Sequence, residues 1–450
     1  MVPTPSVRAP FFNRFRAVWW MSLMGAWLGL TLVKLGNPVI LDNKVQPPTD
    51  FLELVFQPWP LRWGWGLLGV LLLLGLGSRQ WSLRVSPNRW LAAPLVWLIW
   101  QWVAASTTVD LPLSTITLAH FTVCTILFYL GLFSPQSHTG TAPIFWGILL
   151  GFLFVVWVGF DQHFGGLEAT RMMVSEQVGW ENLPKEYLKR LRSDRIFATL
   201  VYPNALAGAI LLCLPVLIVF VFRLLYRYSF VVLAVPVGML AYFGVACMVW
   251  SGSKAGWLLS LLLLTVWVWH LKPLLRWRTL IVALVALVGV SLFAVKYSSY
   301  FQKGATSVGA RVDYWSAAVD TLKKRPLLGS GPGTFSIMYR AVKSPESEMA
   351  LLAHNDYLQQ GSDSGIVGML LYFCIFPAGV IQLYRKSRRD NLTFVLWLGL
   401  LGWTLQGFVE FGLYIPALSG CSFFFLGWLH GVGSPTMRCG FDTKTGIVNK

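Results

Sequence analysis

The sequence predicts an all-α polytopic membrane protein, and composition and hydropathy patterning carry that prediction. The chain has a mean hydropathy of +0.61, and only 12% of its 450 residues are charged, while it contains 23 Trp and 30 Phe. This is more apolar surface than one soluble core could hide. Long apolar windows also recur along most of the chain, with no repeat and no Pro/Ser linker that would mark a second domain. We therefore expect residues 1–450 to form one integral membrane domain.

About twelve segments are apolar enough to cross a bilayer. A helix needs about 20 mostly apolar residues to span a hydrocarbon core of roughly 30 Å. The expected spans fall near residues 18–36, 61–77, 88–106, 112–134, 143–160, 203–222, 229–250, 255–271, 279–296, 364–384, 392–413 and 415–433.

The distribution of charge predicts the orientation of these spans. With the N-terminus inside, the inner segments contain half of the 36 Lys and Arg residues but only two acids, Asp390 and Asp442. Lys and Arg are retained preferentially on the cytoplasmic side, so both termini are expected in the cytoplasm. A basic inner surface facing anionic lipid accounts for the net charge of +17 without nucleic acid. We read residues 1–17 and the first span as a retained anchor, since no small-x-small cleavage site follows.

This orientation leaves two long outer loops, at 161–202 and 297–363. Both have helical periodicity: 181–193 aligns Leu183, Tyr187 and Leu191, and 313–326 aligns Trp315, Val319 and Leu322. Such stripes cap a helical bundle, lie along the bilayer surface or form a lid over a cavity. The glycine-rich run at 329–335 follows no strand and precedes no GK[ST], so it predicts a tight chain reversal and not a nucleotide P-loop.

The cysteines are expected to be packing residues and not disulfide partners or metal ligands. Five lie in expected spans and the sixth is cytoplasmic, which favours neither a disulfide framework nor a CxxC metal site. They are Cys124, Cys213, Cys247, Cys374, Cys421 and Cys439.

Charged residues at membrane depth or at the outer interface are the candidate site residues, because charges there are costly and rarely idle. The candidates are Arg195, Lys254, Arg311 and His354, with Glu410 and Asp363 as acids at the same level. Lys254 and Lys296 also have a simpler interpretation, in which the ammonium group extends to the membrane–water interface and binds no ligand.

One segment resembles a known family. His354 and Asn355, nine further residues, then Gly365, two residues and Gly368 match the His-Asn-x9-Gly-xx-Gly signature of the O-antigen ligase and polymerase superfamily. Other segments similar to that family are TLVYPNALAG after Arg195, SGSKAGW, GARVDYWSAAVDTLKKRPLLGSGPGTF and EFGLYIPA. The resemblance covers about residues 190–420. The family often has Arg in place of Lys254 and usually Glu in place of Asp363.

This resemblance implies a GT-C-like bundle that transfers a glycan from an undecaprenyl diphosphate carrier on the periplasmic face of the bacterial inner membrane. The acceptor would be a lipid-linked glycan such as lipid A core. Fixed cations can stabilise a diphosphate leaving group, so Arg195 and Arg311 would form a diphosphate clamp with Lys254 as a third cation. His354 would take the proton from the acceptor hydroxyl, and Asn355, Tyr314 and Asn204 would bind substrate. No cofactor is expected, and the outer loops show no paired-acid metal cluster.

The glycines of the signature have a structural interpretation. Gly365 and Gly368 would let their helix approach a neighbouring helix closely. Asn355 or Asp356 would cap the start of that helix.

Several functions share this pattern. A ligase, an O-antigen or exopolysaccharide polymerase and a protein-glycosylating relative would use the same chemistry, and the residues do not separate them. A lipid-linked glycan flippase or exporter belongs to another class. A transporter would carry polar groups through the full depth of several spans, whereas here they gather at the outer ends. The pattern therefore favours an enzyme.

Overall fold

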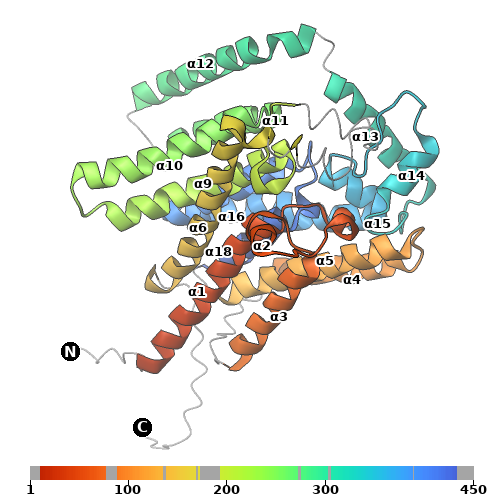
Figure 1. The fold of residues 1–450 in the computed structure, drawn as a ribbon, viewed down its shortest axis with the longest axis horizontal. Helices are drawn as coiled ribbons and strands as arrows, with labels where there is room; N and C mark the ends of the chain where they lie inside the picture. The colour runs from red at the N-terminus through yellow and green to blue at the C-terminus, as the bar shows by residue number, and fades with distance from the viewer. Residues whose placement is uncertain are drawn as a thin grey trace, which may run out of the picture.

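The structure is a computed structural model that describes residues 11–77, 89–134, 138–168, 171–172, 193–271, 275–302, 306–388 and 390–432. Every regular element within these ranges is a helix, and Figure 1 shows them gathered into one bundle. The predicted fold class, an all-α polytopic membrane protein, is confirmed.

The main helices follow the apolar windows. They are α1 (Phe11–Lys34), α3 (Leu61–Gly77), α4 (Ala93–Ala105), α5 (Leu111–Phe133), α6 (His138–Asp161), α9 (Pro203–Leu225), α10 (Phe230–Trp250), α11 (Lys254–His270), α12 (Leu275–Gln302), α15 (Asp356–Phe373), α16 (Gly379–Ser387), α17 (Asn391–Gln406) and α18 (Pro416–Gly431). The remaining elements connect them. They are the helices α2 (Phe51–Phe56), α13 (Thr306–Lys324) and α14 (Phe335–Val342), the 3₁₀ turns η1 (Val39–Lys44), η2 (Arg89–Ala92), η5 (Ala198–Leu200) and η7 (Gly412–Tyr414), and the π turns η3 (Gln162–Gly166) and η6 (Cys374–Ala378).

Three helix pairs form the centre of the bundle: α1 with α6, α5 with α18, and α9 with α17. The first crossing is close because small residues face each other. A Cβ added at Gly29 would lie 2.1 Å from the carbonyl oxygen of Gly147, and one added at Gly151 would lie 2.3 Å from that of Gly29. Backbones that approach this closely associate through van der Waals packing, which is the main attraction available between helices in lipid.

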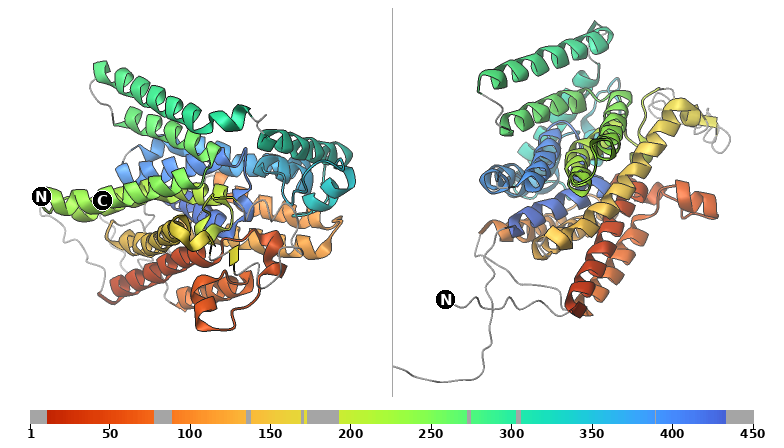
Figure 2. Two further views of the ribbon diagram at one scale, coloured as in Figure 1. Left: turned by 45° about the horizontal axis from the view of Figure 1, so that its top comes forward. Right: turned by 90° about the vertical axis from the view of Figure 1, so that its left-hand side faces the viewer.

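Helix α12 differs from the central pairs because it lies at the edge of the bundle. Only 6% of its most apolar window, within 279–300, is buried, compared with 78% for the window in α9. Its main packing partner is α11, and both views in Figure 2 show it outside the other helices. The exposed apolar side of α12 is suited to lipid.

The number of membrane crossings stays a prediction. By length and hydropathy, six helices within the described residues can cross a membrane, and three shorter ones are apolar. A helix occupies each of the twelve expected ranges, but four boundaries differ by six residues or more. Helix α1 begins at Phe11 and not at 18, α12 continues to Gln302 and not only to 296, α15 begins at Asp356 and not at 364, and α17 ends at Gln406 and not at 413.

The early start of α15 has a physical reason. Its first turns are polar, which suggested a loop, yet Gln359, Gln360 and Asp363 are buried and hydrogen-bonded within the protein. Polar side chains with partners are compatible with a buried helix.

The segment between α12 and α15, which the sequence predicts as an outer loop, packs around a small core of its own. Tyr314, Ala317 and Ala318 of α13 are buried there with Phe335 and Tyr339 of α14. The predicted stripe of Trp315, Val319 and Leu322 is only half-buried, because the fully buried side of α13 includes the small alanines. Figure 1 shows α13 and α14 at one end of the molecule.

Some predictions fall on residues outside the described ranges. Most of the expected helix at 181–193 and the position of Cys439 are among them. The other five cysteines are free thiols.

Candidate functional site

Glu410 is the centre of a polar network between the helix ends. It lies after α17, and its side chain is only 7% exposed. One carboxylate oxygen, Oε1, accepts from Arg311 Nη2 of α13 and from Asn204 Nδ2 of α9, the latter at 2.5 Å. The other, Oε2, lies 3.2 Å from His354 Nδ1. The structure thus brings three predicted site residues onto one carboxylate.

Arg195 joins the same network through Asn204. Its Nη2 donates to Asn204 Oδ1 at 2.9 Å, and its Nε donates to the carbonyl oxygen of Ser251 at 2.7 Å. Both nitrogens therefore have fixed partners in the folded protein. The guanidinium is held in place before any ligand arrives.

The backbone at His354 is unusual. Its φ is +50°, a left-handed conformation that is uncommon for residues other than glycine. Asn355 then begins α15, because its side-chain oxygen accepts from the backbone N–H groups of Tyr357 and Leu358, both at 3.0 Å. This cap confirms the predicted role of Asn355 at the helix start, while its contact with substrate stays a prediction.

The segment that carries Glu410 is held from two sides. Asp356 Oδ2 accepts from the N–H of Leu413 at 3.1 Å, and the N–H of Asp356 donates to the carbonyl of Gly407 at 2.7 Å. On the other side, His120 Nε2 of α5 lies 2.9 Å from the carbonyl oxygen of Leu413. These contacts fix residues 407–413 against both α15 and α5.

Two further predicted residues border the network. The ring of Tyr314 stacks on that of His354, with centroids 5.8 Å apart, so it supports the imidazole. Lys254 begins α11, and its Nζ lies 3.8 Å from the ring centroid of Tyr300. Lys254 is close enough to interact electrostatically with Arg195 and Arg311, but it makes no ion pair with Glu410 among the described residues.

The charges of the network determine the state of Glu410. Burial alone raises the pKa of this carboxyl, but Arg311, His354 and Arg195 outweigh burial, and the pKa lies below its ordinary value. Glu410 is therefore a carboxylate at neutral pH. An anionic partner on Nδ1 favours the tautomer with its proton on that nitrogen, which leaves Nε2 as the basic nitrogen. Within the described ranges, Nε2 of His354 has no hydrogen-bond partner.

The acids and histidines do not resemble a metal centre. Over the part of the chain that the structure describes, no three His, Cys, Asp or Glu side chains gather in a way that could hold an ion. A metal-independent reaction stays a prediction.

Asp363 and the glycine-rich run form a structural junction beside the site. Asp363 Oδ2 accepts from the N–H of Gly333, from Gln359 Nε2 and from the hydroxyl of Tyr414 at 2.8 to 2.9 Å. Gly329, Gly331 and Gly333 all have positive φ, as expected for a tight reversal.

The two signature glycines act differently from each other. Gly365 does not pack against a helix: its φ is +72°, and an added Cβ would lie 2.0 Å from the carbonyl of Leu327 in the loop after α13. The predicted helix–helix role is therefore wrong for Gly365. At Gly368 an added Cβ would lie 2.1 Å from Ser364 Oγ of its own helix and 3.4 Å from Gln101 Nε2 of α4, so Gly368 does lie at the contact with α4.

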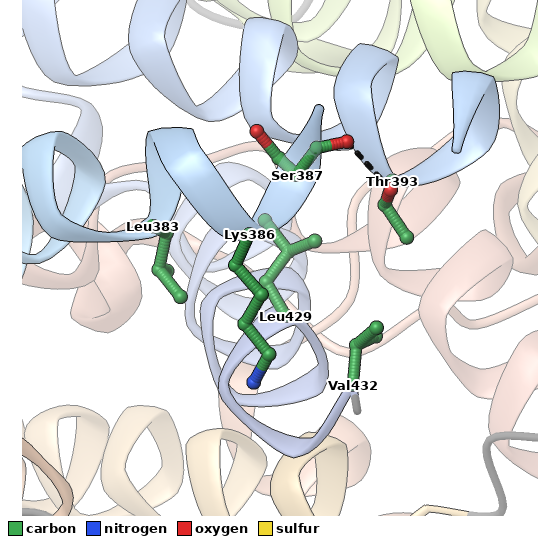
Figure 3. Close-up of a pocket in the computed structure, with 6 residues that line it drawn as sticks. All are labelled: Leu383, Lys386, Ser387, Thr393, Leu429 and Val432. Carbon is green, nitrogen blue, oxygen red and sulfur yellow. Dashed lines mark hydrogen bonds between the residues drawn. The ribbon is translucent and has the colours of Figure 1, made fainter. Parts of the chain in front are cut away.

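A small pocket of about 150 Å³ elsewhere in the bundle has a different lining. It lies between the ends of α16 and α18 and the start of α17, and its lining is Leu383, Lys386, Ser387, Thr393, Leu429 and Val432 (Figure 3). Lys386 Nζ is bonded to the carbonyl of His430 at 2.6 Å. Nothing in this lining resembles the carboxylate–imidazole pair of Glu410 and His354.

Comparison with known families bears on the same residues. Residues 239–373 match the family model described as O-antigen ligase. This segment, under a third of the chain, is therefore similar to the O-antigen ligase family. It contains Lys254, Arg311 and His354, whereas Arg195, Asn204 and Glu410 lie outside the matched residues and join the site through the fold.

A relative is found among curated proteins. An uncharacterized protein of Haemophilus influenzae is 25% identical over 166 residues. The alignment covers 32% of this chain and 41% of that protein, so the similarity extends over less than half of either.

Sequence reasoning identified most of the network but not its centre. The sequence places Glu410 at the level of the candidate cations but gives it no role in the site. One feature of the sequence does point to Glu410. It is a carboxylate in EFGLYIPA, between two apolar helices, with no Lys or Arg near it in sequence.

Proposed function

We propose that the protein transfers a glycan from a polyprenyl diphosphate carrier, such as undecaprenyl diphosphate, to a hydroxyl group of an acceptor glycan. The acceptor class is a lipid-linked glycan such as lipid A core, and the reaction takes place on the periplasmic face of the bacterial inner membrane. The match of residues 239–373 to the O-antigen ligase family model supports glycan transfer in general. The observation that carries the finer proposal is the His354–Glu410 pair beside Arg195, Arg311 and Lys254.

The chemistry needs a base and a stabilised leaving group. His354 Nε2 takes the proton of the acceptor hydroxyl as its oxygen bonds to the anomeric carbon of the donor sugar. The bond from that carbon to the phosphate oxygen breaks, and the electron pair leaves with the carrier diphosphate. Direct attack inverts the anomeric carbon.

The cations act on the departing diphosphate. Its charge grows as the bond breaks, and preorganised positive groups at the leaving group are usually the largest catalytic contribution. Arg195 and Arg311 offer guanidinium N–H groups for phosphate oxygens, and Lys254 adds a third charge. Glu410 orients the side chains of His354 and Arg311, so it is a positioning residue.

Reconstitution tests this function. Purified protein is incubated with a lipid-diphosphate-linked glycan and candidate acceptors, and both product and free carrier diphosphate are measured. Transfer to a lipid-linked core supports a ligase. Lengthening of the donor glycan identifies a polymerase, and movement of the intact donor across the bilayer without transfer would replace the enzyme with a flippase.

A further inference from the structure

Two tyrosines at the outer end of α12 hold Lys254. Its Nζ lies 3.8 Å from the ring centroid of Tyr300 and 5.1 Å from that of Tyr297. A cation over an aromatic face is attracted to the ring. The two rings therefore fix the position of Lys254 at the first turn of α11.

The hydroxyl groups of these tyrosines are in different situations. Tyr300 Oη shares a hydrogen bond with Ser307 Oγ at 2.6 Å. Tyr297 is only 7% exposed, and its Oη is buried without a hydrogen-bond partner among the described residues. Buried hydroxyl groups in folded proteins usually have partners, so this one requires an explanation.

The surroundings of Tyr297 explain why its hydroxyl has no partner. The end of α10 and the turn that follows it are both bonded, since Lys296 Nζ of α12 donates to the carbonyl of Val249 at 2.8 Å and Arg195 Nε donates to that of Ser251 at 2.7 Å. This turn sets the start of α11 and the end of α12 beside Arg195. Tyr297 is near enough to interact electrostatically with the Arg195 guanidinium.

We infer that the Tyr297 hydroxyl binds the diphosphate of the polyprenyl carrier, next to Lys254 and Arg195. This inference rests on the proposed function. A neutral phenol O–H donates to a phosphate oxygen without adding charge, and hydrogen bonds to charged groups are stronger than those between neutral groups. No proton is transferred. The hydroxyl gains its missing partner when the carrier binds.

Substituting Tyr297→Phe tests this assignment, because it removes only the hydroxyl and keeps the ring over Lys254. The probe is undecaprenyl diphosphate itself, bound to the full-length protein in lipid nanodiscs. We expect binding to weaken roughly tenfold, as for the loss of one hydrogen bond to a charged group. Thermal unfolding is expected to be unchanged or to move to higher temperature, because a hydroxyl without a protein partner does not stabilise the fold.

The matched control is Tyr129→Phe, which removes a tyrosine hydroxyl of α5 that already has a partner, the carbonyl oxygen of Leu91 at 2.9 Å. Carrier binding is expected to match the wild-type protein in this variant. Wild-type binding by Tyr297→Phe would overturn the inference, as would a lower unfolding temperature that revealed a structural role. Failure of the wild-type protein to bind the carrier diphosphate would overturn the proposed donor as well, so the two failures are distinguishable.

Discussion

The helix pair α9 and α17 has an arginine–carboxylate pair near each end, and the two carboxylates have different surroundings. At one end Arg223 pairs with Asp390, and at the other Arg311 pairs with Glu410. Asn204 and Arg223 are 19 residues apart on α9, so the ends are separated by roughly 28 Å at 1.5 Å per residue. This is about the thickness of the hydrocarbon core.

The difference lies in what each carboxylate does besides bind arginine. Asp390 caps α17, since its Oδ2 accepts from the N–H groups of Leu392 and Thr393, and both partners of its ion pair are 31% exposed. Glu410 is buried, and its other oxygen faces an imidazole. An ion pair that only closes a helix end is structural, whereas one that also orients a titratable side chain is a candidate for chemistry.

The largest expected effect is at His354. Replacing it with Ala should leave expression and donor binding near normal and lower turnover by roughly 10² to 10⁴-fold, the range for losing a general base. Single-turnover transfer at saturating donor measures this. Wild-type turnover in His354→Ala would remove the base from the mechanism.

Glu410 and Asp390 give a direct comparison between the two ends. Glu410→Gln keeps the shape of the side chain but loses the charge that orients His354 and pairs Arg311, so we expect kcat to fall by roughly 10 to 100-fold. Asp390→Asn should leave kcat unchanged and lower stability by about 1 kcal/mol or less, as for a partly exposed ion pair. Equal losses of kcat in both variants would show that the two ends do not differ in function.

Arg311 and Arg223 allow the same comparison between the two ends of the α9–α17 pair. Arg311→Lys keeps the charge but loses the planar fork, so transfer should fall nearly as much as in Arg311→Ala if the guanidinium holds both Glu410 and a phosphate oxygen. Arg223→Lys is the matched control and should transfer at the wild-type rate. Donor consumption at matched protein levels and saturating acceptor separates the variants, and a normal rate in Arg311→Lys would limit this arginine to a general electrostatic role.

The smallest effect is expected from removal of metal ions. Because cations of the protein would neutralise the diphosphate, EDTA should leave the transfer rate unchanged. The same assay with added Mg²⁺ or Mn²⁺ provides the comparison. A transfer rate that falls with EDTA and recovers when Mg²⁺ or Mn²⁺ is added would contradict the assignment. Acids such as Asp313 and Glu410 would then be candidate metal ligands.

The sequence predicted the helical fold well because hydropathy reports directly on burial in lipid or protein. It also pointed to Arg195, Arg311 and His354, which the structure brings into one polar network, since charged groups at helix ends are conspicuous in an apolar chain. It could not show that Asn204 links Arg195 to Glu410, because that contact joins the start of α9 to the end of α17. The early start of α15 was missed for a related reason, as the partners of Gln360 are Trp97, Gln101 and Tyr414, far away in sequence.

The position of Glu410 also determines when the site can exist during synthesis. The residue lies between α17 and α18, the last two helices that the structure describes, whereas His354 precedes α15. Chains are made from the N-terminus onward and their segments fold in that order. His354 is therefore present in the membrane before its carboxylate partner, and the imidazole gains its orientation only when the α17–α18 hairpin has been inserted. A nascent chain that has reached only α16 carries the arginines and the histidine without the group that organises them.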